Sequence, residues 1–272
     1  MTGLSFEFFP PRSDKARRSM MEAVKTLTAF EPDYVSVTFG AGGSTRNGTL
    51  DTLNDIHERT AVTTAAHLCY SGLDRNDVLS YADRLWEAGH RKIVALRGDA
   101  DAGDAPTFAD TPEFVRVLRE RHPFALAVAC YPEVHPKASS LEDDIGVLLA
   151  KQEAGASEAI TQFFFDNDVF HRFVAKARSA GVTIPIVPGV LPIHDLDKAV
   201  SFAETCGASV PQWVRERFQR DPHAGRCLIV EQVEALRREG VDHLHVYALN
   251  KAELSADAAR AFLAEGNERI AA

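Results

Sequence analysis

Short apolar runs alternate with longer amphipathic stretches along the whole chain. Eight of these runs are rich in β-branched or aromatic residues and have the length of a strand. They cover residues 5–9, 34–39, 63–69, 92–96, 125–131, 159–165, 185–191 and 243–249. The pattern therefore predicts eight strands.

Helical spacing of apolar residues fills the segments between these runs. It predicts helices over residues 14–30, 47–59, 76–88, 111–121, 141–154, 167–180 and 195–205. Thr111, directly before Pro112, is expected to cap the fourth helix, because proline is favoured at the first helical position. Four glycines are expected to end helices, where a left-handed residue is favoured: Gly89, Gly155, Gly181 and Gly207.

The alternation changes before the last strand. Residues 210–218 and 223–239 predict two additional helices there, and residues 255–265 predict a final helix. Strict alternation of strands and helices implies parallel strands with right-handed crossovers. Eight such units most simply close into an α/β fold of the (β/α)8 TIM-type barrel, as a single domain over residues 1–272. An open doubly wound sheet gives a similar pattern and remains an alternative.

Composition narrows the class of protein. The chain has 272 residues, 45% hydrophobic and 25% charged, which is ordinary for a globular protein with a large core. The net charge of -9 argues against a nucleic-acid partner, which usually requires a basic face. Four widely spaced cysteines without a C-x-x-C pair, no signal-peptide pattern and no membrane-length apolar run predict a reduced, cytoplasmic protein.

Candidate chemistry lies at the carboxyl ends of the strands, where such barrels place their active sites. Glu7 stands inside the apolar Phe6-Glu7-Phe8-Phe9, where a carboxylate is costly to bury unless it is paired or kept protonated. A raised pKa would suit Glu7 to general-acid catalysis. Alternatively, strand alternation simply turns Glu7 to the other face. The fourth strand ends in Leu96-Arg97-Gly98-Asp99, which offers either a ligand site or a mutual ion pair that holds the loop.

Other polar residues follow further strands. Tyr131, Glu133 and His135 lie in a proline-stiffened loop, and no third ligand accompanies Glu133 and His135, so no metal is expected. Gln162 is a lone amide in an apolar strand, which a heterocyclic ligand would satisfy. Thr38 precedes the glycine-rich residues 40–43, a weak dinucleotide signal. His67, His243 and His245 are interpreted as core histidines, the last two on one strand face.

Six motifs, in this order, resemble the methylenetetrahydrofolate reductase family over nearly the whole chain. They are Phe6-Glu7-Phe8-Phe9-Pro10-Pro11, Val35-Ser36-Val37-Thr38-Phe39-Gly40, Ala95-Leu96-Arg97-Gly98-Asp99, Tyr131-Pro132-Glu133-Val134-His135-Pro136, Ala159-Ile160-Thr161-Gln162-Phe163-Phe164-Phe165-Asp166 and Pro188-Gly189-Val190-Leu191-Pro192. The resemblance implies a TIM-type barrel that reduces 5,10-methylenetetrahydrofolate to 5-methyltetrahydrofolate with NAD(P)H, NADH being favoured.

The resemblance also implies roles for individual residues. By position, Glu7 is the acid that protonates the folate nitrogen, Asp99 lies beside the pterin, and Gln162 binds the pterin. Phe202, Leu249 and Lys251 match folate-binding positions. Lys251 stands where the family tends to have arginine; it keeps the positive charge but cannot make a bidentate contact with the glutamate tail of the folate. Small-molecule substrates are the expected partners, and the sequence leaves the oligomeric state open.

In the usual family member, hydride passes through bound FAD. The residues matching the flavin-binding positions are Thr38, His67, Arg97, Gly98, Asp99, Tyr131, His135, Asp144 and Lys151. Val147 and Ala150, however, replace a typical asparagine and arginine, which removes charge-assisted bonds worth about 1.5 to 3 kcal/mol each. We therefore expect weak or no flavin binding and direct transfer from NADH to the folate. An ordinary FAD-dependent ping-pong reductase and a non-catalytic folate-binding barrel are the alternatives.

Overall fold

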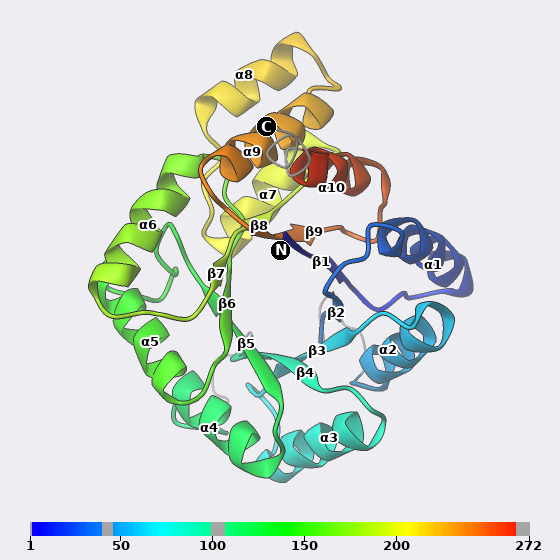
Figure 1. The fold of residues 1–272 in the computed structure, drawn as a ribbon, viewed down its shortest axis with the longest axis vertical. Coiled ribbons are helices and arrows are strands. Elements are labelled where there is room, and N and C mark those ends of the chain that lie inside the picture. Colours follow the sequence, from blue (N-terminus) through cyan, green and yellow to red (C-terminus); the bar gives the residue numbers. More distant parts are fainter. Residues whose placement is uncertain (1, 40–45, 99–106, 265–272) are drawn as a thin grey trace, which may run out of the picture.

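The chain folds into a barrel of parallel strands surrounded by helices (Figure 1). The computed structural model describes residues 2–39, 46–98 and 107–264. The strands of the described residues are β1 Gly3–Phe8, β2 Tyr34–Val37, β3 Thr64–Cys69, β4 Lys92–Leu96, β5 Ala125–Cys130, β6 Glu158–Thr161, β7 Ile186–Val187, β8 Gly189–Val190 and β9 His243–Tyr247. The helices are α1 Asp14–Thr28, α2 Arg46–Thr60, α3 Arg75–Glu87, α4 Thr111–Arg121, α5 Leu141–Glu153, α6 Asn167–Ser179, α7 Leu196–Cys206, α8 Gln212–Arg220, α9 Gly225–Arg238 and α10 Glu253–Ala264.

The sheet closes on itself through one short segment that contains both β7 and β8. The strand order is β7-β6-β5-β4-β3-β2-β1-β9-β8, and β7 and β8 are separated only by Pro188. Proline has no N–H to donate, so it interrupts the ladder at this position. Its carbonyl still accepts a hydrogen bond from His245 N at 3.0 Å. The predicted strand over residues 185–191 thus pairs with β6 at one end and with β9 at the other.

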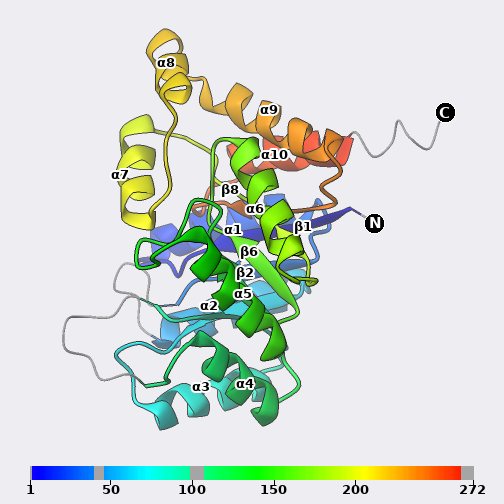
Figure 2. The same ribbon diagram turned by 90° about the vertical axis from the view of Figure 1, so that its left-hand side faces the viewer.

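This order confirms the TIM-type barrel. In a doubly wound sheet the strand order reverses near the middle, whereas here neighbouring strands follow one another along the chain from β1 to β7. The two additional helices, α8 and α9, lie between α7 and β9, as the sequence indicates. Figures 1 and 2 show α8 at the periphery, beyond α7 and α9.

Strand alternation separates an outer and an inner apolar layer. Phe6 and Phe8 are fully buried in the layer between the sheet and the helices. The barrel interior holds a smaller cluster, formed by Tyr34, Ala65, Val94, Ala127 and Ile160. A third cluster lies where the ends of β6 and β8 meet α7, α8 and α9, and it includes Phe163 and Phe165. Glu7, between Phe6 and Phe8, therefore faces inward.

One predicted helix cap is wrong by a single residue. Asp110, with φ -158°, is the N-cap of α4, and its carboxylate accepts a hydrogen bond from Glu113 N at 2.7 Å. Thr111 and Pro112 lie in the first turn instead. Both Asp110 and Thr111 are good caps, so sequence alone did not distinguish them. Gly207 does end α7 in the left-handed conformation, with φ 71°.

No helix among residues 2–39, 46–98 and 107–264 is long and apolar enough to cross a membrane.

Candidate active site

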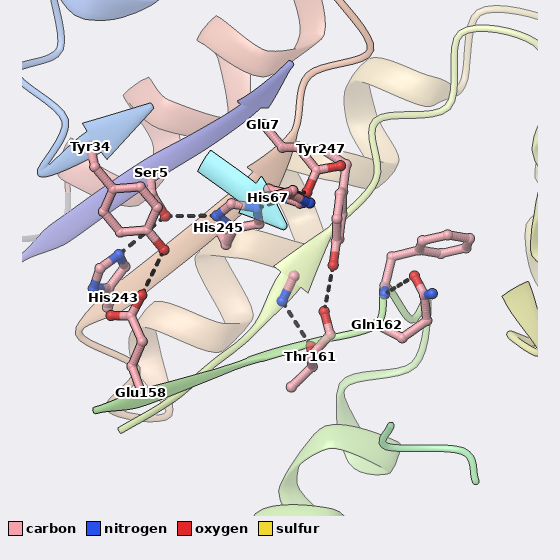
Figure 3. A network of polar contacts seen from close by, with 12 residues as sticks. Ser5, Glu7, Tyr34, His67, Glu158, Thr161, Gln162, His243, His245 and Tyr247 are labelled. Carbon is pink, nitrogen blue, oxygen red and sulfur yellow. Dashed lines mark hydrogen bonds and ion pairs between the residues drawn. The ribbon is translucent and has the colours of Figure 1, made fainter. Parts of the chain in front are cut away.

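Glu7 lies at the inner face of β1, between two histidines (Figure 3). Its Oε2 is 3.3 Å from His67 Nε2 on β3 and 3.6 Å from His245 Nε2 on β9. The Glu7 side chain is 18% exposed, whereas that of His245 is fully buried. The carboxylate therefore stands where the polar interior of the barrel meets its open end. The second interpretation, that alternation merely turns Glu7 away from the site, does not hold.

The charge of Glu7 results from two opposing effects. Burial raises its pKa, but the imidazoles of His67 and His245 lower it, and the net shift is downward. Burial also lowers the pKa of His67, against the attraction of Glu7. Of the two states expected for a buried carboxylate, the structure therefore has the paired one and not a raised pKa, and the sequence did not reveal the two imidazoles that face Glu7. A carboxylate in this state must gain a proton before it can act as an acid.

Several buried polar atoms around Glu7 lack a hydrogen-bond partner. They are Ser36 Oγ and Thr38 Oγ1, and also His67 Nε2 and His245 Nε2, which make ion-pair contacts with Glu7 but no hydrogen bond. Ser36 is the register neighbour of Glu7 on β2, and Thr38 follows two residues later. Buried polar groups are normally satisfied, so this group of atoms is suited to a polar ligand.

The backbone just after β4 lies close to the end of the neighbouring strand β3. Gly98 has φ +80°, and an added Cβ would lie 2.8 Å from Cys69 Cβ, so only glycine fits this turn. The Arg97 carbonyl accepts hydrogen bonds from Tyr70 N and Ser71 N. Asp99, predicted as both a catalytic and a cofactor-binding residue, lies outside the described residues, as do residues 40–43.

Four predicted cofactor-binding residues meet at the end of β5 and on α5. The rings of Tyr131 and His135 are nearly perpendicular, with centroids 4.5 Å apart. His135 N donates to Asp144 Oδ2 at 2.5 Å. Lys151 Nζ donates to the Ala129 carbonyl at 2.9 Å, and burial lowers the pKa of this lysine. The structure thus brings these side chains of the β5–α5 unit together at one edge of the barrel.

The neighbouring surface of α5 is apolar. Val147 is 46% exposed, and Ala150 is partly exposed on the same helix. Neither side chain can hydrogen-bond a phosphate or a ribityl hydroxyl. Among the described residues, no group of three or more His, Cys, Asp or Glu side chains is placed to hold a metal ion.

Gln162 follows β6 and borders a narrow pocket. Its Oε1 accepts a hydrogen bond from Phe163 N at 3.0 Å. The pocket beside it is lined by Tyr131, Pro132, Glu133, Val134, Gln162, Phe163, Gly207 and Ala208. Phe202 on α7 stacks on Phe163 with ring centroids 5.3 Å apart and remains 41% exposed. The predicted amide and aromatic positions are therefore adjacent.

Leu249 and Lys251 lie just past β9. Leu249 has φ 50° and packs against the apolar cluster that contains Phe163. Lys251 is exposed. Asn250, between them, holds the end of β1 through two side-chain bonds to the Phe9 backbone, of 3.0 and 2.9 Å.

Sequence reasoning missed Tyr247. Its side chain lies between His245 and Gln162 (Figure 3). Its hydroxyl donates to the Thr161 carbonyl at 2.7 Å. Its ring centroid is 5.2 Å from that of His245 and 6.0 Å from that of Phe163. The available signal was the period of two along β9, which turns residues 243, 245 and 247 to the same face.

Comparison with known proteins assigns the family. The model of the family described as methylenetetrahydrofolate reductase matches residues 1–261. The chain belongs to the methylenetetrahydrofolate reductase family. It is 38% identical over 259 residues to the 5,10-methylenetetrahydrofolate reductase of Salmonella typhimurium, with 93% of this chain and 88% of the relative covered. The resemblance stated from the six motifs is thereby confirmed, and the chain is an oxidoreductase of this family.

Two further relatives and one solved structure are also similar to this chain. The Escherichia coli 5,10-methylenetetrahydrofolate reductase is 37% identical, with the same coverage. A protein of Oryza sativa named "Probable methylenetetrahydrofolate reductase (NADH)" is 30% identical, with 92% of this chain but 46% of the relative covered. Among solved structures, a Clostridium thermocellum protein described as binding two copies of 5-methyl-5,6,7,8-tetrahydrofolic acid has a TM-score of 0.68 at 14% identity, covering 98% and 95% of the chains. That likeness supports the barrel fold alone.

Proposed function

We propose that the protein reduces 5,10-methylenetetrahydrofolate to 5-methyltetrahydrofolate, with NADH as the preferred hydride donor and direct transfer in a ternary complex. The observation that carries this proposal is the Glu7 carboxylate, held at the open end of the barrel by His67 and His245. The names of the relatives support the reaction, and that of the Oryza sativa protein supports NADH.

Glu7 is the proton donor in this proposal. Its proton passes to the folate nitrogen that leaves as the imidazolidine ring opens, and the exposed iminium carbon then accepts hydride from the reduced nicotinamide. Bound rings would exclude water from Glu7, which raises the pKa of a carboxylate and so favours the protonated acid. Two imidazoles within 3.6 Å offer a source for that proton.

The other residues bind and orient the folate. Gln162 has both a donor and an acceptor for the pterin edge, although its Oε1 is shared with Phe163 N. Phe202 offers an exposed ring face beside Gln162 for stacking. Lys251 contributes charge for the glutamate tail, and Asp99 completes the set.

The residues at the flavin-matching positions are better suited to the redox ring of a cofactor than to its diphosphate. Thr38 Oγ1 is buried without a hydrogen-bond partner and would suit the polar edge of a flavin or a nicotinamide. The α5 surface at Val147 and Ala150 has no group for a phosphate. This contrast supports a site in which a redox ring, such as a nicotinamide, is held without the usual diphosphate contacts of FAD on α5.

The ordinary flavoenzyme is the second candidate. It is favoured by the assembly of Tyr131, His135, Asp144 and Lys151, the remaining flavin-matching residues around β5 and α5. In that case FAD would supply the hydride, and other residues would make the contacts missing at Val147 and Ala150.

The absorbance spectrum of the purified full chain, before and after addition of FAD and desalting, separates the two. Direct transfer predicts no retained flavin, NADH-dependent turnover without FAD, and intersecting initial-rate lines when both substrates are varied. Stoichiometric flavin with parallel lines would instead establish the ping-pong flavoenzyme. In the same preparation, Glu7→Gln is expected to lower kcat by roughly 10²- to 10⁴-fold while folate still binds, because a positioned acid contributes about that much. Glu22→Gln, on the exposed face of α1, is the control.

A further inference from the structure

A column of polar side chains crosses the barrel interior from the amino ends of the strands to Glu7. It consists of His243 and His245 on β9, Ser5 and Glu7 on β1, and Asp33 just before β2. Figure 3 shows the Ser5 hydroxyl beside the ring of His245, and His245 beside His67 and Glu7. The column is continuous because Ser5 and His245 are register partners of adjacent parallel strands.

The two contacts of Ser5 have hydrogen-bond length, and the contacts at the two ends of the column are longer. His243 Nε2 lies 3.3 Å from Ser5 Oγ, and Ser5 Oγ lies 2.8 Å from His245 Nδ1. The other ring nitrogen of His245, Nε2, is 3.6 Å from Glu7 Oε2. At the outer end, Asp33 Oδ2 is 3.9 Å from His243 Nε2.

Solvent reaches both ends of the column and not its middle. Ser5 and His245 are fully buried. The side chains of Asp33 and His243 are 57% and 21% exposed, and that of Glu7 is 18% exposed at the opposite end. A proton can therefore enter from water at the amino face of the barrel and leave at the active site.

One choice of histidine tautomers orders these hydrogen bonds for transfer toward Glu7. Ser5 has one hydroxyl proton, so it can donate to His245 Nδ1 while it accepts from His243 Nε2. A neutral His245 that accepts at Nδ1 carries its proton on Nε2, the atom nearest Glu7. In this tautomer each imidazole can release the proton on its Nε2 and accept another proton on its Nδ1.

Packing alone does not require these polar residues. On the opposite side of the same interior, β4, β5 and β6 contribute Val94, Ala127 and Ile160, and β4 and β6 also contribute the ion pair of Lys92 with Glu158. Burying a hydroxyl and two imidazoles instead costs free energy unless their hydrogen bonds compensate. The polar side chains of the column are confined to the strands that carry or flank the proposed acid.

The reduction consumes one proton per turnover. Hydride goes to carbon, and the proton of Glu7 goes to the folate nitrogen, so Glu7 is left ionised and must be protonated again. Bound folate and nicotinamide would cover the open end of the barrel at that moment. An internal route then supplies the proton without requiring the substrates to leave.

We propose that His243, Ser5 and His245 form a proton relay that reloads Glu7 from the amino face of the barrel. The Nε2–H bond of His245 breaks as Glu7 gains its O–H bond. Ser5 passes its proton to His245 Nδ1, His243 passes its Nε2 proton to Ser5 Oγ, and water reprotonates His243. The relay rests on the proposed function, because it acts only through Glu7.

The groups around His243 leave it able to transfer protons. Lys92 Nζ and the Tyr34 hydroxyl each lie 2.9 Å from Glu158 Oε1, so this carboxylate is paired. Burial lowers the pKa of His243, while Glu158 and Asp33 raise it and His245 and Lys92 lower it further. A mostly neutral imidazole at the entrance can take a proton from water and release it inward.

Ser5→Ala tests the relay by removing its central hydroxyl. We expect kcat to fall at least about tenfold, and by no more than the roughly 10²- to 10⁴-fold that positioned proton transfer contributes, with the KM values unchanged. The solvent deuterium isotope effect on kcat should rise, and the isotope effect of deuterated NADH should fall, because proton supply becomes rate-limiting. A purely structural role of Ser5 would not raise the solvent isotope effect while lowering the isotope effect of deuterated NADH.

His243→Ala adds a rescue experiment at the partly exposed end. Imidazole in the buffer should restore kcat in this variant and should have no effect on Ser5→Ala. Thr64→Val is the matched control. Thr64 is also buried, and its Oγ1 lies 2.6 Å from an imidazole nitrogen, Nδ1 of His90. This pair does not connect to Glu7. The control variant should keep the kcat and both isotope effects of the original protein.

The outcomes separate the relay from the proposed function. If Glu7→Gln is inactive while Ser5→Ala and His243→Ala keep normal kcat and isotope effects, the relay is wrong and the function stands. A fall in kcat without a larger solvent isotope effect also overturns the relay, since it reports positioning only. If Glu7→Gln retains activity, the acid assignment itself fails.

Discussion

At the scale of single residues, the environment of each polar side chain decides its chemistry. Glu7 is paired with two imidazoles, Lys151 is engaged by a backbone carbonyl, and Gln162 is partly satisfied by its own neighbour. These contacts come from strands up to 238 residues apart in sequence, since Glu7 and His245 are the most distant pair. Phe202 differs, because its outer ring face remains free for a ligand.

Phe202→Ala should weaken folate binding about three- to tenfold, because an aromatic stacking contact contributes roughly 0.5 to 1.5 kcal/mol. Its effect on the free energy of unfolding should be small, since the ring is 41% exposed. Titration of folate by fluorescence or calorimetry measures the affinity. Trp213→Ala, another half-exposed aromatic but on α8, is the control and should bind folate normally. Equal losses in both variants would argue against a folate contact at Phe202.

At the scale of elements, the split strand at Pro188 is the point where the barrel closes. Gly189 N donates to Thr161 Oγ1 at 2.8 Å, and Tyr247 crosses to the Thr161 carbonyl. A Cβ at Gly189 would lie 2.4 Å from that carbonyl oxygen and 2.6 Å from the Tyr247 ring. The contact that closes the barrel therefore also forms part of the wall of the candidate active site.

Gly189→Ala should lower the free energy of unfolding by about 1 to 3 kcal/mol, the usual cost of overpacking, and should reduce activity by displacing Tyr247. Urea unfolding with a parallel activity assay measures both. Gly146→Ala is the matched control on α5, where an added Cβ meets nothing within 4 Å. It should raise stability by roughly 0.5 to 1 kcal/mol through the helix preference of alanine. A Gly189→Ala variant as stable as the original would contradict the close approach.

At the scale of the whole molecule, buried histidines link folding to pH. Burial lowers the pKa of His67, His243 and His90, the last to about 4. His90 is satisfied as a neutral ring by Thr64 and Asn54, at 2.6 and 2.9 Å. Between pH 6.5 and about 4, the unfolded chain therefore binds protons that the folded chain does not.

The free energy of unfolding should consequently decrease as pH falls from 6.5 to about 4. One such histidine contributes up to about 1.4 kcal/mol per pH unit, or roughly 3 kcal/mol over this range for His90. Urea unfolding at several pH values should show a shallower decline for His90→Gln, whatever its absolute stability. His223→Gln, on the exposed surface, should keep the original slope. The same slope in both variants would rule out a neutral buried His90.

The sequence predicted most of the architecture because strand and helix periodicities are local. All eight apolar runs are strands, and α4 has the predicted bounds, whereas the α4 cap was misplaced and the break at Pro188 was not predicted. Glu7, Gln162 and the loop after β5 were recognised because polar groups in apolar strands are costly. Tyr247 was missed and His245 was interpreted only as structural, because aromatic and imidazole residues are common in cores.

The sequence by itself therefore determined the order and type of the elements, the family, and which carboxyl and amide groups stand at strand ends. Only the tertiary structure decided which side chains face one another across the barrel. It placed His67 and His245 against Glu7, where they lower the pKa of the carboxyl group, and it aligned Ser5 between two histidines. The reason is physical: periodicity is a property of neighbouring residues, whereas charge pairing and proton transfer depend on distances that arise only when β1, β3 and β9 meet.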